Sequence, residues 1–164
     1  MEKEPLSDLD KHIISILTKD ASITNLELSK KIGVSPSTCL SRTNRLKERG
    51  IIKHVVIVNE EAIGMEFTAF TEVTLSTPNR KTVDMFVEHI KSLPNVLECY
   101  NISGNSDFLI KVVAKSPKDF RNFVLDKLTD LKGIGKISTS VVLYVEKRNF
   151  SFLEHEEPEK NAAT

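Results

Sequence analysis

Basic and hydroxyl side chains gather in one stretch of the chain, residues 29–54, where they could bind an anionic polymer. This stretch carries seven Lys or Arg against one Glu, although the 164-residue chain has 23 basic and 23 acidic residues in all. A local excess of positive charge favours an anionic partner that binds at one limited surface. A solvent-exposed helix face without any partner would show the same excess. Hydroxyls allow close approach, and Arg binds guanine edges or phosphates, so the predicted partner is double-stranded DNA. A helix is predicted to begin at Ser35 and Pro36, and its outward positions would be Ser37, Thr38, Ser41, Arg42 and Arg45.

Three short helices are expected to hold this surface. Ser7–Asp10 begins the first with acidic residues in its first turn, and Thr24–Glu27 begins the second as a capping box. Gly33 ends the second helix, and Ser35 and Pro36 begin the third. Two helices joined by a short turn that contains Gly are typical of a helix-turn-helix, whose second helix enters the major groove. A three-helix subdomain with a solvated third helix fits the same pattern.

The chain after the third helix is predicted to be extended. Ile51–Val55 has the residue types of a strand, and Lys53 and His54 fall where a wing would touch the DNA backbone. We therefore assign residues 1–54 to a DNA-binding domain and residues 55–66 to a linker strand and loop. The expected DNA contacts are Ser35, Ser37, Thr38, Ser41, Arg42, Arg45, Lys53 and His54.

Strand and helix signals alternate over residues 67–150 in the order β-α-β-β-α-β, the ferredoxin-like arrangement. One face of such a sheet is open, and an open face rich in apolar side chains favours oligomerisation. The predicted fold class is α+β, with a winged helix-turn-helix before the ferredoxin-like domain and an acidic, flexible tail at residues 151–164. The predicted strands are Phe67–Leu75, Val96–Ile102, Phe108–Ala114 and Ile137–Val145.

Other functions find little support in the residues. The third predicted strand lacks the aromatic motif of RNA-binding sheets. The four histidines lack metal-ligand spacing, and no phosphate loop or nucleophile signature occurs. We expect no catalytic residue, metal or cofactor, and turnover of an amino acid would revive the weaker hypothesis of an enzyme. No apolar stretch is long enough to span a bilayer, and no secretory signal is visible. The simplest expectation is therefore a cytoplasmic location without membrane contact. Cys39 and Cys99 are expected to be small core residues.

Several motifs together resemble the Lrp/AsnC family of transcription regulators, the leucine-responsive or feast/famine group. The resemblance covers residues 7–150, and Thr43 stands where the family usually has Val. In the N-terminal part the motifs are Leu9-Asp10 through Leu17, Asn25-Leu26-Glu27-Leu28, Gly33-Val34-Ser35-Pro36-Ser37, Cys39, Arg42, Arg45-Leu46 and Gly50-Ile51-Ile52. In the C-terminal part they are Ser103-Gly104-Asn105-Ser106-Asp107-Phe108, which looks like the family's Gly-x-x-Asp-aromatic turn, and Thr139-Ser140-Val141-Val142-Leu143.

The resemblance implies homodimers that associate into octamers and a C-terminal domain that binds small amino acids, a leucine-like ligand among them. The effector would lie between dimers, near the turn that contains Gly104 and Asp107. Turn amides would bind its carboxylate, and Asp107 would either pair with its α-ammonium group or hold the turn in shape. The further residues expected to line this site are Ser103, Asn105, Ser106, Thr139, Ser140 and Val141.

The predicted function is a sequence-specific DNA-binding transcription regulator whose assembly or DNA affinity responds to an amino acid. The alternative is an architectural DNA-binding protein that needs no ligand. It would share the basic surface and the fold, and would differ by a weak sequence preference and by insensitivity to amino acids.

Overall fold

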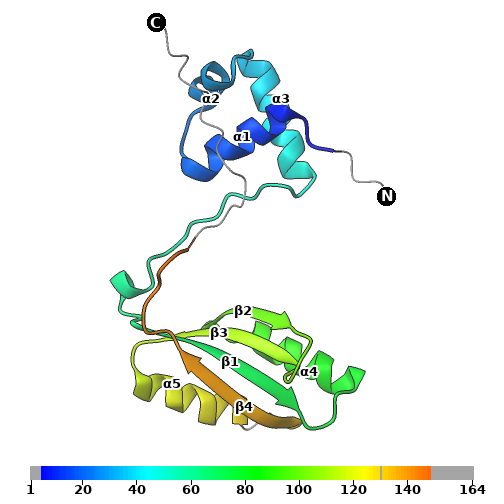
Figure 1. The fold of residues 1–164 in the computed structure, drawn as a ribbon, viewed down its shortest axis with the longest axis vertical. Coiled ribbons are helices and arrows are strands. Elements are labelled where there is room, and N and C mark those ends of the chain that lie inside the picture. Colours follow the sequence, from blue (N-terminus) through cyan, green and yellow to red (C-terminus); the bar gives the residue numbers. More distant parts are fainter. Residues whose placement is uncertain (1–4, 130, 149–164) are drawn as a thin grey trace, which may run out of the picture. The chain divides into compact units, whose positions relative to one another are not determined.

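A computed structural model describes residues 5–129 and 131–148 of the chain. The chain divides into two compact units, one built on the residues up to Val56 and the other spanning Ile57–Glu146 (Figure 1). The first unit is helical, and the second contains an antiparallel sheet with its helices. No helix in the described ranges is long and apolar enough to cross a membrane.

The first unit consists of helices α1 (Asp8–Lys19), α2 (Asn25–Ile32) and α3 (Pro36–Glu48). Each begins as predicted, because the side chain of the preceding Ser or Thr accepts a hydrogen bond from a backbone N–H of the first turn. Helix α2 ends at Gly33, whose φ of 70° is left-handed, as predicted. The buried apolar core between the helices is formed by Ile13, Ile14, Leu28, Cys39 and Leu46.

The strand predicted from Ile51 onward is not formed. Residues 52–59 have no regular secondary structure, and a short 3₁₀ turn, η1 (Glu61–Ile63), follows. The β-branched run Val55–Val58 suits a strand, but a strand also needs a neighbour for its backbone hydrogen bonds, and no described segment pairs with it. Val56 is accordingly 90% exposed. The predicted wing strand and linker strand are therefore wrong for the single chain.

The second unit has the predicted β-α-β-β-α-β order. Its strands form one antiparallel sheet in the order β2-β3-β1-β4. Strands β1 and β3 have the predicted bounds, and β2 ends one residue earlier than predicted. Strand β4 spans Ile134–Val141, where Ile137–Val145 was predicted, because its pairing with β1 covers that range. The elements are β1 (Phe67–Leu75), α4 (Arg80–Lys91), β2 (Val96–Asn101), β3 (Phe108–Ala114), α5 (Pro117–Phe123), the π-helical continuation η2 (Val124–Thr129) and β4 (Ile134–Val141).

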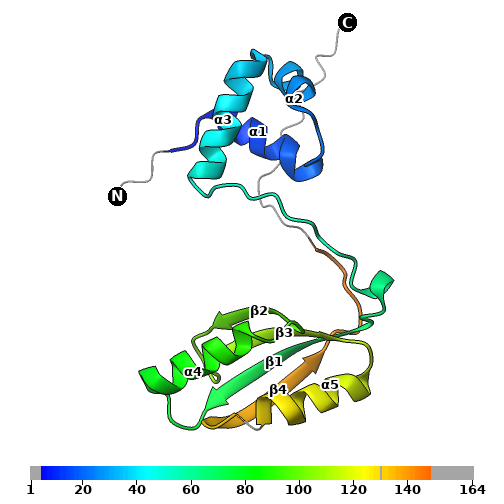
Figure 2. The same cartoon turned by 180° about the vertical axis from the view of Figure 1, so that it is seen from behind.

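Helices α4 and α5 cover one face of this sheet (Figure 2). The rings of Phe86 on α4 and Phe108 on β3 pack with their centroids 4.5 Å apart. No helix among the described residues of this unit covers the opposite face, and the pairing register places Phe70, Lys111 and Glu98 side by side on it. The core under the helices consists of Val73, Leu75, Phe86, Ile90, Phe108, Ile110, Val112 and Leu128.

The two cysteines lie in different environments. Cys39 has no exposed surface and packs in the helical core, as predicted. Cys99 is exposed, so its prediction as a core residue is wrong. Strand β2, which carries Cys99, is an edge strand with a neighbouring strand on one side alone. The alternation of polar and apolar residues along a strand does not show whether that strand lies at an edge. Neither cysteine forms a disulfide.

Candidate DNA-binding surface and effector turn

Helix α3 presents its polar side to solvent because its other side is packed. Cys39, Thr43 and Leu46 are buried, as their helical spacing predicts. At the start of the helix, Ser35 Oγ accepts the Thr38 backbone N–H at 3.2 Å. Pro36 occupies the first helical position, where its missing N–H costs nothing. The side of α3 that lies opposite these buried residues faces solvent.

The predicted outward residues of α3 line one open depression of about 430 Å³. Four of these five residues are exposed, and Arg42 is half-buried. Ser35 lies beside the depression and hydrogen-bonds Ser37 Oγ and Thr38 Oγ1, at 3.0 and 2.8 Å. The lining is formed by Ser37, Thr38, Ser41, Arg42 and Arg45.

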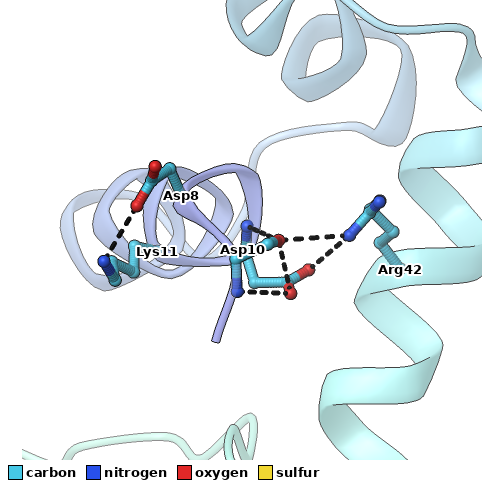
Figure 3. Close-up of polar contacts among 5 residues, drawn as sticks. Asp8, Asp10, Lys11 and Arg42 are labelled. Carbon is cyan, nitrogen blue, oxygen red and sulfur yellow. Dashed lines mark hydrogen bonds and ion pairs between the residues drawn. The ribbon is translucent and has the colours of Figure 1, made fainter. Parts of the chain in front are cut away.

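Arg42 joins this surface to the start of α1 (Figure 3). Its Nη1 donates to Asp10 Oδ1 at 3.1 Å and to Ser7 Oγ at 3.2 Å. Burial alone would raise the pKa of the Asp10 carboxyl, but the hydrogen bonds from Ser7 and Arg42 outweigh burial and lower it. The sequence identified Asp10 only as a residue of the first helical turn, since its partner is 32 residues away.

Lys53 and His54 are exposed in the irregular segment after α3. They do not line the depression on α3. The structure therefore gathers five of the eight predicted DNA contacts at one place and leaves these two on the adjoining segment.

Thr43 has a hydroxyl that the helical core does not satisfy. Its Oγ1 is buried and has no hydrogen-bond partner within the described ranges. The Cys39 thiol is one helical turn away; burial raises the pKa of this thiol, and the nearby Thr43 hydroxyl opposes the rise. A buried hydroxyl without a good partner costs stability.

The turn between β2 and β3 has the conformation that its residues predict. Gly104 has a φ of 136°, a conformation that favours glycine. Asp107 Oδ2 accepts the Leu75 backbone N–H at 2.7 Å, and the Asp107 N–H donates to the Val73 carbonyl at 3.0 Å. Asp107 thus ties the turn to the end of β1, which is the second of the two roles considered for it.

A second carboxylate lies at this turn and was not predicted. Ser106 Oγ donates to Glu72 Oε2 at 2.9 Å, from the turn to strand β1. Thr74 Oγ1 lies 3.4 Å from the carbonyl oxygen of Asn105. In the sequence Glu72 is only one polar residue of an alternating strand, so nothing there indicated the contact.

The structure does not bring all the predicted effector residues together in one chain. Thr139 pairs with Thr71 across the β1–β4 ladder, and the two hydroxyl oxygens lie 3.2 Å apart. Val141 pairs with Ala69, four residues before Val73, so it lies about 13 Å along β1 from the turn. Ser140 faces Phe70 on the same ladder. The turn and the end of β4 therefore belong to different parts of the sheet.

Polar side chains also occupy the centre of the open sheet face. Lys111 is buried although no helix covers it, and its Nζ lies 3.5 Å from Glu98 Oε1. Tyr100 donates its hydroxyl to Glu98 Oε2 at 2.6 Å, and this hydrogen bond raises the pKa of Tyr100. Within the described residues, no group of three or more metal-ligating side chains occurs anywhere.

Comparisons with known proteins agree with this two-part architecture. Residues 6–53 match the family model described as winged helix-turn-helix DNA-binding. Residues 68–152 match the model of the Lrp/AsnC ligand binding domain. The chain belongs to the Lrp/AsnC family. Like other members of this family of transcription regulators, it joins a DNA-binding helix-turn-helix to a ligand-binding domain.

Relatives of similar length support the assignment. The transcriptional regulator AzlB of Bacillus subtilis is 47% identical over 147 residues, covering 89% of this chain and 94% of AzlB. The leucine-responsive regulatory protein of Escherichia coli K12 is 32% identical over 87% of this chain and 89% of its own.

Solved structures of the family have the same fold. A transcriptional regulator of Neisseria meningitidis, NMB0573, solved as a complex with L-Met, superposes with a TM-score of 0.85 at 28% identity, over 90% of this chain and 96% of that one. Escherichia coli AsnC superposes with a TM-score of 0.82 at 26% identity, over 89% and 97% of the two chains.

Proposed function

We propose that this Lrp/AsnC protein regulates transcription in the cytoplasm in response to an amino acid that binds at the turn containing Gly104. The observation that carries the proposal is the L-Met complex of the Neisseria meningitidis regulator, whose fold this chain shares at a TM-score of 0.85. The exposed backbone of the turn offers amides for the carboxylate of an amino acid, and the carboxylate of Glu72 beside it offers a partner for the ammonium group. Because Thr139, Ser140 and Val141 lie farther along the sheet, a second copy of the chain would supply them.

The effector is tested with a panel of L-amino acids, Met and Leu among them, by thermal shift and light scattering on the full chain. A ligand that binds the native state stabilises it by about 2.7 kcal/mol at a hundredfold excess over Kd. We expect a selective shift for one chemical class, with the D-enantiomers as controls. A panel without any shift or change in mass would favour the architectural alternative.

The same assay on a turn variant tests the place of binding. Asp107→Ala removes the bond to the Leu75 N–H and should abolish the ligand-induced shift while DNA binding persists. A wild-type response in this variant would exclude the turn as the effector site.

We propose that the depression on α3 is the DNA contact and that Ser35, Lys53 and His54 extend it. A dimer would place two such helices about 34 Å apart, or a multiple of that, on a roughly palindromic site. Arg42→Ala and Arg45→Ala should each weaken binding to a duplex selected from a random library by the wild-type protein. Lys47→Ala is the matched control, because Lys47 lies on the same helix outside the depression. Equal affinities for all four proteins would refute the assignment.

We also propose that the open sheet face packs against a second copy of the chain, and that such dimers associate into octamers. This face combines the apolar Phe70 with both signs of charge, Lys111 and Glu98, so a copy related by a two-fold axis can be complementary to it.

A further inference from the structure

A carboxylate on α1 and a guanidinium on the candidate recognition helix meet across the helical unit. Arg42 Nη1 contacts both Asp10 Oδ1 and Ser7 Oγ, at 3.1 and 3.2 Å (Figure 3). The Asp10 side chain is only 13% exposed, whereas 38% of the Arg42 side chain remains exposed. This pair is thus partly screened from water, unlike the neighbouring pair of Lys11 with Asp8, whose carboxylate is 97% exposed.

The Asp10 carboxylate is itself held in place. Its Oδ2 accepts from Ser7 Oγ at 2.7 Å and from the Ser7 backbone N–H at 3.2 Å, which closes the capping box of α1. Its other oxygen, Oδ1, is therefore presented to α3 in a fixed direction. A single side chain both starts α1 and orients a side chain of α3.

Arg42 keeps donors for another partner while it is held. Both contacts to α1 use Nη1, so the three N–H hydrogens on Nη2 and Nε remain for a phosphate or a base edge. The side chain also lines the depression together with Ser41 and Arg45. A long side chain that is already ordered loses less conformational freedom when it binds.

We propose that Asp10 is a positioning residue for DNA recognition: it fixes the Arg42 guanidinium in the orientation that meets DNA. The inference rests on the DNA-contact role proposed above for Arg42. The contrary possibility is that Asp10 neutralises Arg42 and competes with DNA phosphates. The two possibilities predict opposite effects of Asp10 on DNA affinity, because a competing carboxylate would weaken DNA binding and a positioning carboxylate strengthens it.

The test compares Asp10→Asn with Asp8→Asn in the full chain. Both substitutions remove one negative charge from the first turn of α1, but only Asp10 touches α3. Binding is measured on the duplex selected by the wild-type protein and on a mixed-sequence duplex, each over a range of salt concentrations. Asp10→Asn should lose about tenfold in affinity for the selected duplex and less than about threefold for the mixed one, as for loss of one oriented base contact. Asp8→Asn should match the wild type on both.

A conservative variant and a double variant complete the design. Asp10→Glu keeps the charge and the ordinary capping-box residue, so it should recover most of the discrimination between the two duplexes. In Arg42→Ala, the further change Asp10→Asn should have no additional effect on this discrimination. If Asp10→Asn does not fold, Arg42→Lys replaces it in these comparisons. Arg42→Lys leaves Asp10 intact and keeps the positive charge, and it should still lose discrimination between the two duplexes.

Each of the following results would overturn the inference. Tighter binding by Asp10→Asn with a steeper salt dependence would show that Asp10 competes with DNA. An equal loss on both duplexes, or full discrimination by Arg42→Lys, would show that the pair only supports the fold. Wild-type binding by Arg42→Ala would remove the DNA-contact role of Arg42 as well, whereas weak binding by Arg42→Ala with wild-type binding by Asp10→Asn would refute the positioning role alone.

Discussion

At the scale of single residues, the hydroxyl of Thr43 is a local defect in the helical core, since Oγ1 is buried without a hydrogen-bond partner in the described ranges. Thr43→Val replaces it with a methyl group of similar size. We expect the free energy of unfolding to rise by about 1 kcal/mol, measured by urea denaturation with helical circular dichroism. Thr43→Ala is the control and should lower it, because it leaves a cavity. A lower stability for the Val variant would show that the hydroxyl is satisfied in solution.

Asp10 makes stability depend on pH. Its pKa in the folded chain lies below its ordinary value of 3.8, because the bonds from Ser7 and Arg42 outweigh burial. A lowered folded pKa contributes stability that is fully present above the unfolded pKa and is lost as pH falls through the folded pKa. The difference in unfolding free energy between the wild type and Asp10→Asn should thus be constant from about pH 7 to 5 and shrink toward pH 3. A difference that persists unchanged at pH 3 would contradict this.

The turn between β2 and β3 shows how far single residues can be interpreted from sequence. The residue types of the turn predict its shape, because Gly and Asx residues act on their own backbone. The role of Asp107 stayed open, because its partner Leu75 belongs to a strand 32 positions earlier. Glu72 was missed for the same reason, since its bond to Ser106 spans 34 positions. Local chemistry is visible in a sequence, and contacts between distant segments are not.

At the scale of elements, the junction between α2 and α3 depends on one left-handed residue. Gly33 has a φ of 70°, and a Cβ there would meet no atom within 4 Å, so the backbone angle and not space is the constraint. Gly33→Ala should therefore lower the free energy of unfolding by about 1 kcal/mol. Gly33→Asn should cost less, since Asn tolerates this conformation better. Thermal or urea unfolding of both variants is the measurement, and equal stability of Gly33→Ala and the wild type would contradict the expectation.

The bounds of most elements follow from signals inside each segment. Ser7, Thr24 and Ser35 cap their helices in the structure as their sequence context predicts. Strand β4 ends before its predicted end, and the run Val55–Val58 forms no strand at all. Both wrong predictions concern strand pairing. The β propensity of a residue indicates that it suits a strand, but a strand also needs a neighbouring strand to pair with, and propensity does not indicate where that neighbour lies.

At the scale of the whole molecule, the open sheet face governs assembly if a second copy covers it. Phe70 is 37% exposed on this face, beside Lys111. Phe70→Lys would place a second cation at the proposed interface and should shift the light-scattering mass at micromolar concentration from oligomer to monomer. DNA affinity should fall as well, because a monomer contacts one half-site. Leu26→Lys, at a 54% exposed position of α2, is the control and should keep the wild-type mass. An unchanged mass for Phe70→Lys would place the interface elsewhere.

The contrast between the two cysteines gives the chain a built-in attachment point for a probe. Cys39 is fully enclosed and Cys99 is exposed on strand β2, so a maleimide dye should label one thiol per native chain and two per chain in denaturant. Although the residue is exposed, partial burial of its thiol raises the pKa of Cys99, so labelling is faster at mildly alkaline pH, where more thiolate forms. Cys99 lies on the strand that leads into the turn proposed above as the effector site. A fluorophore there would report amino-acid binding on the natural sequence, without any engineered residue.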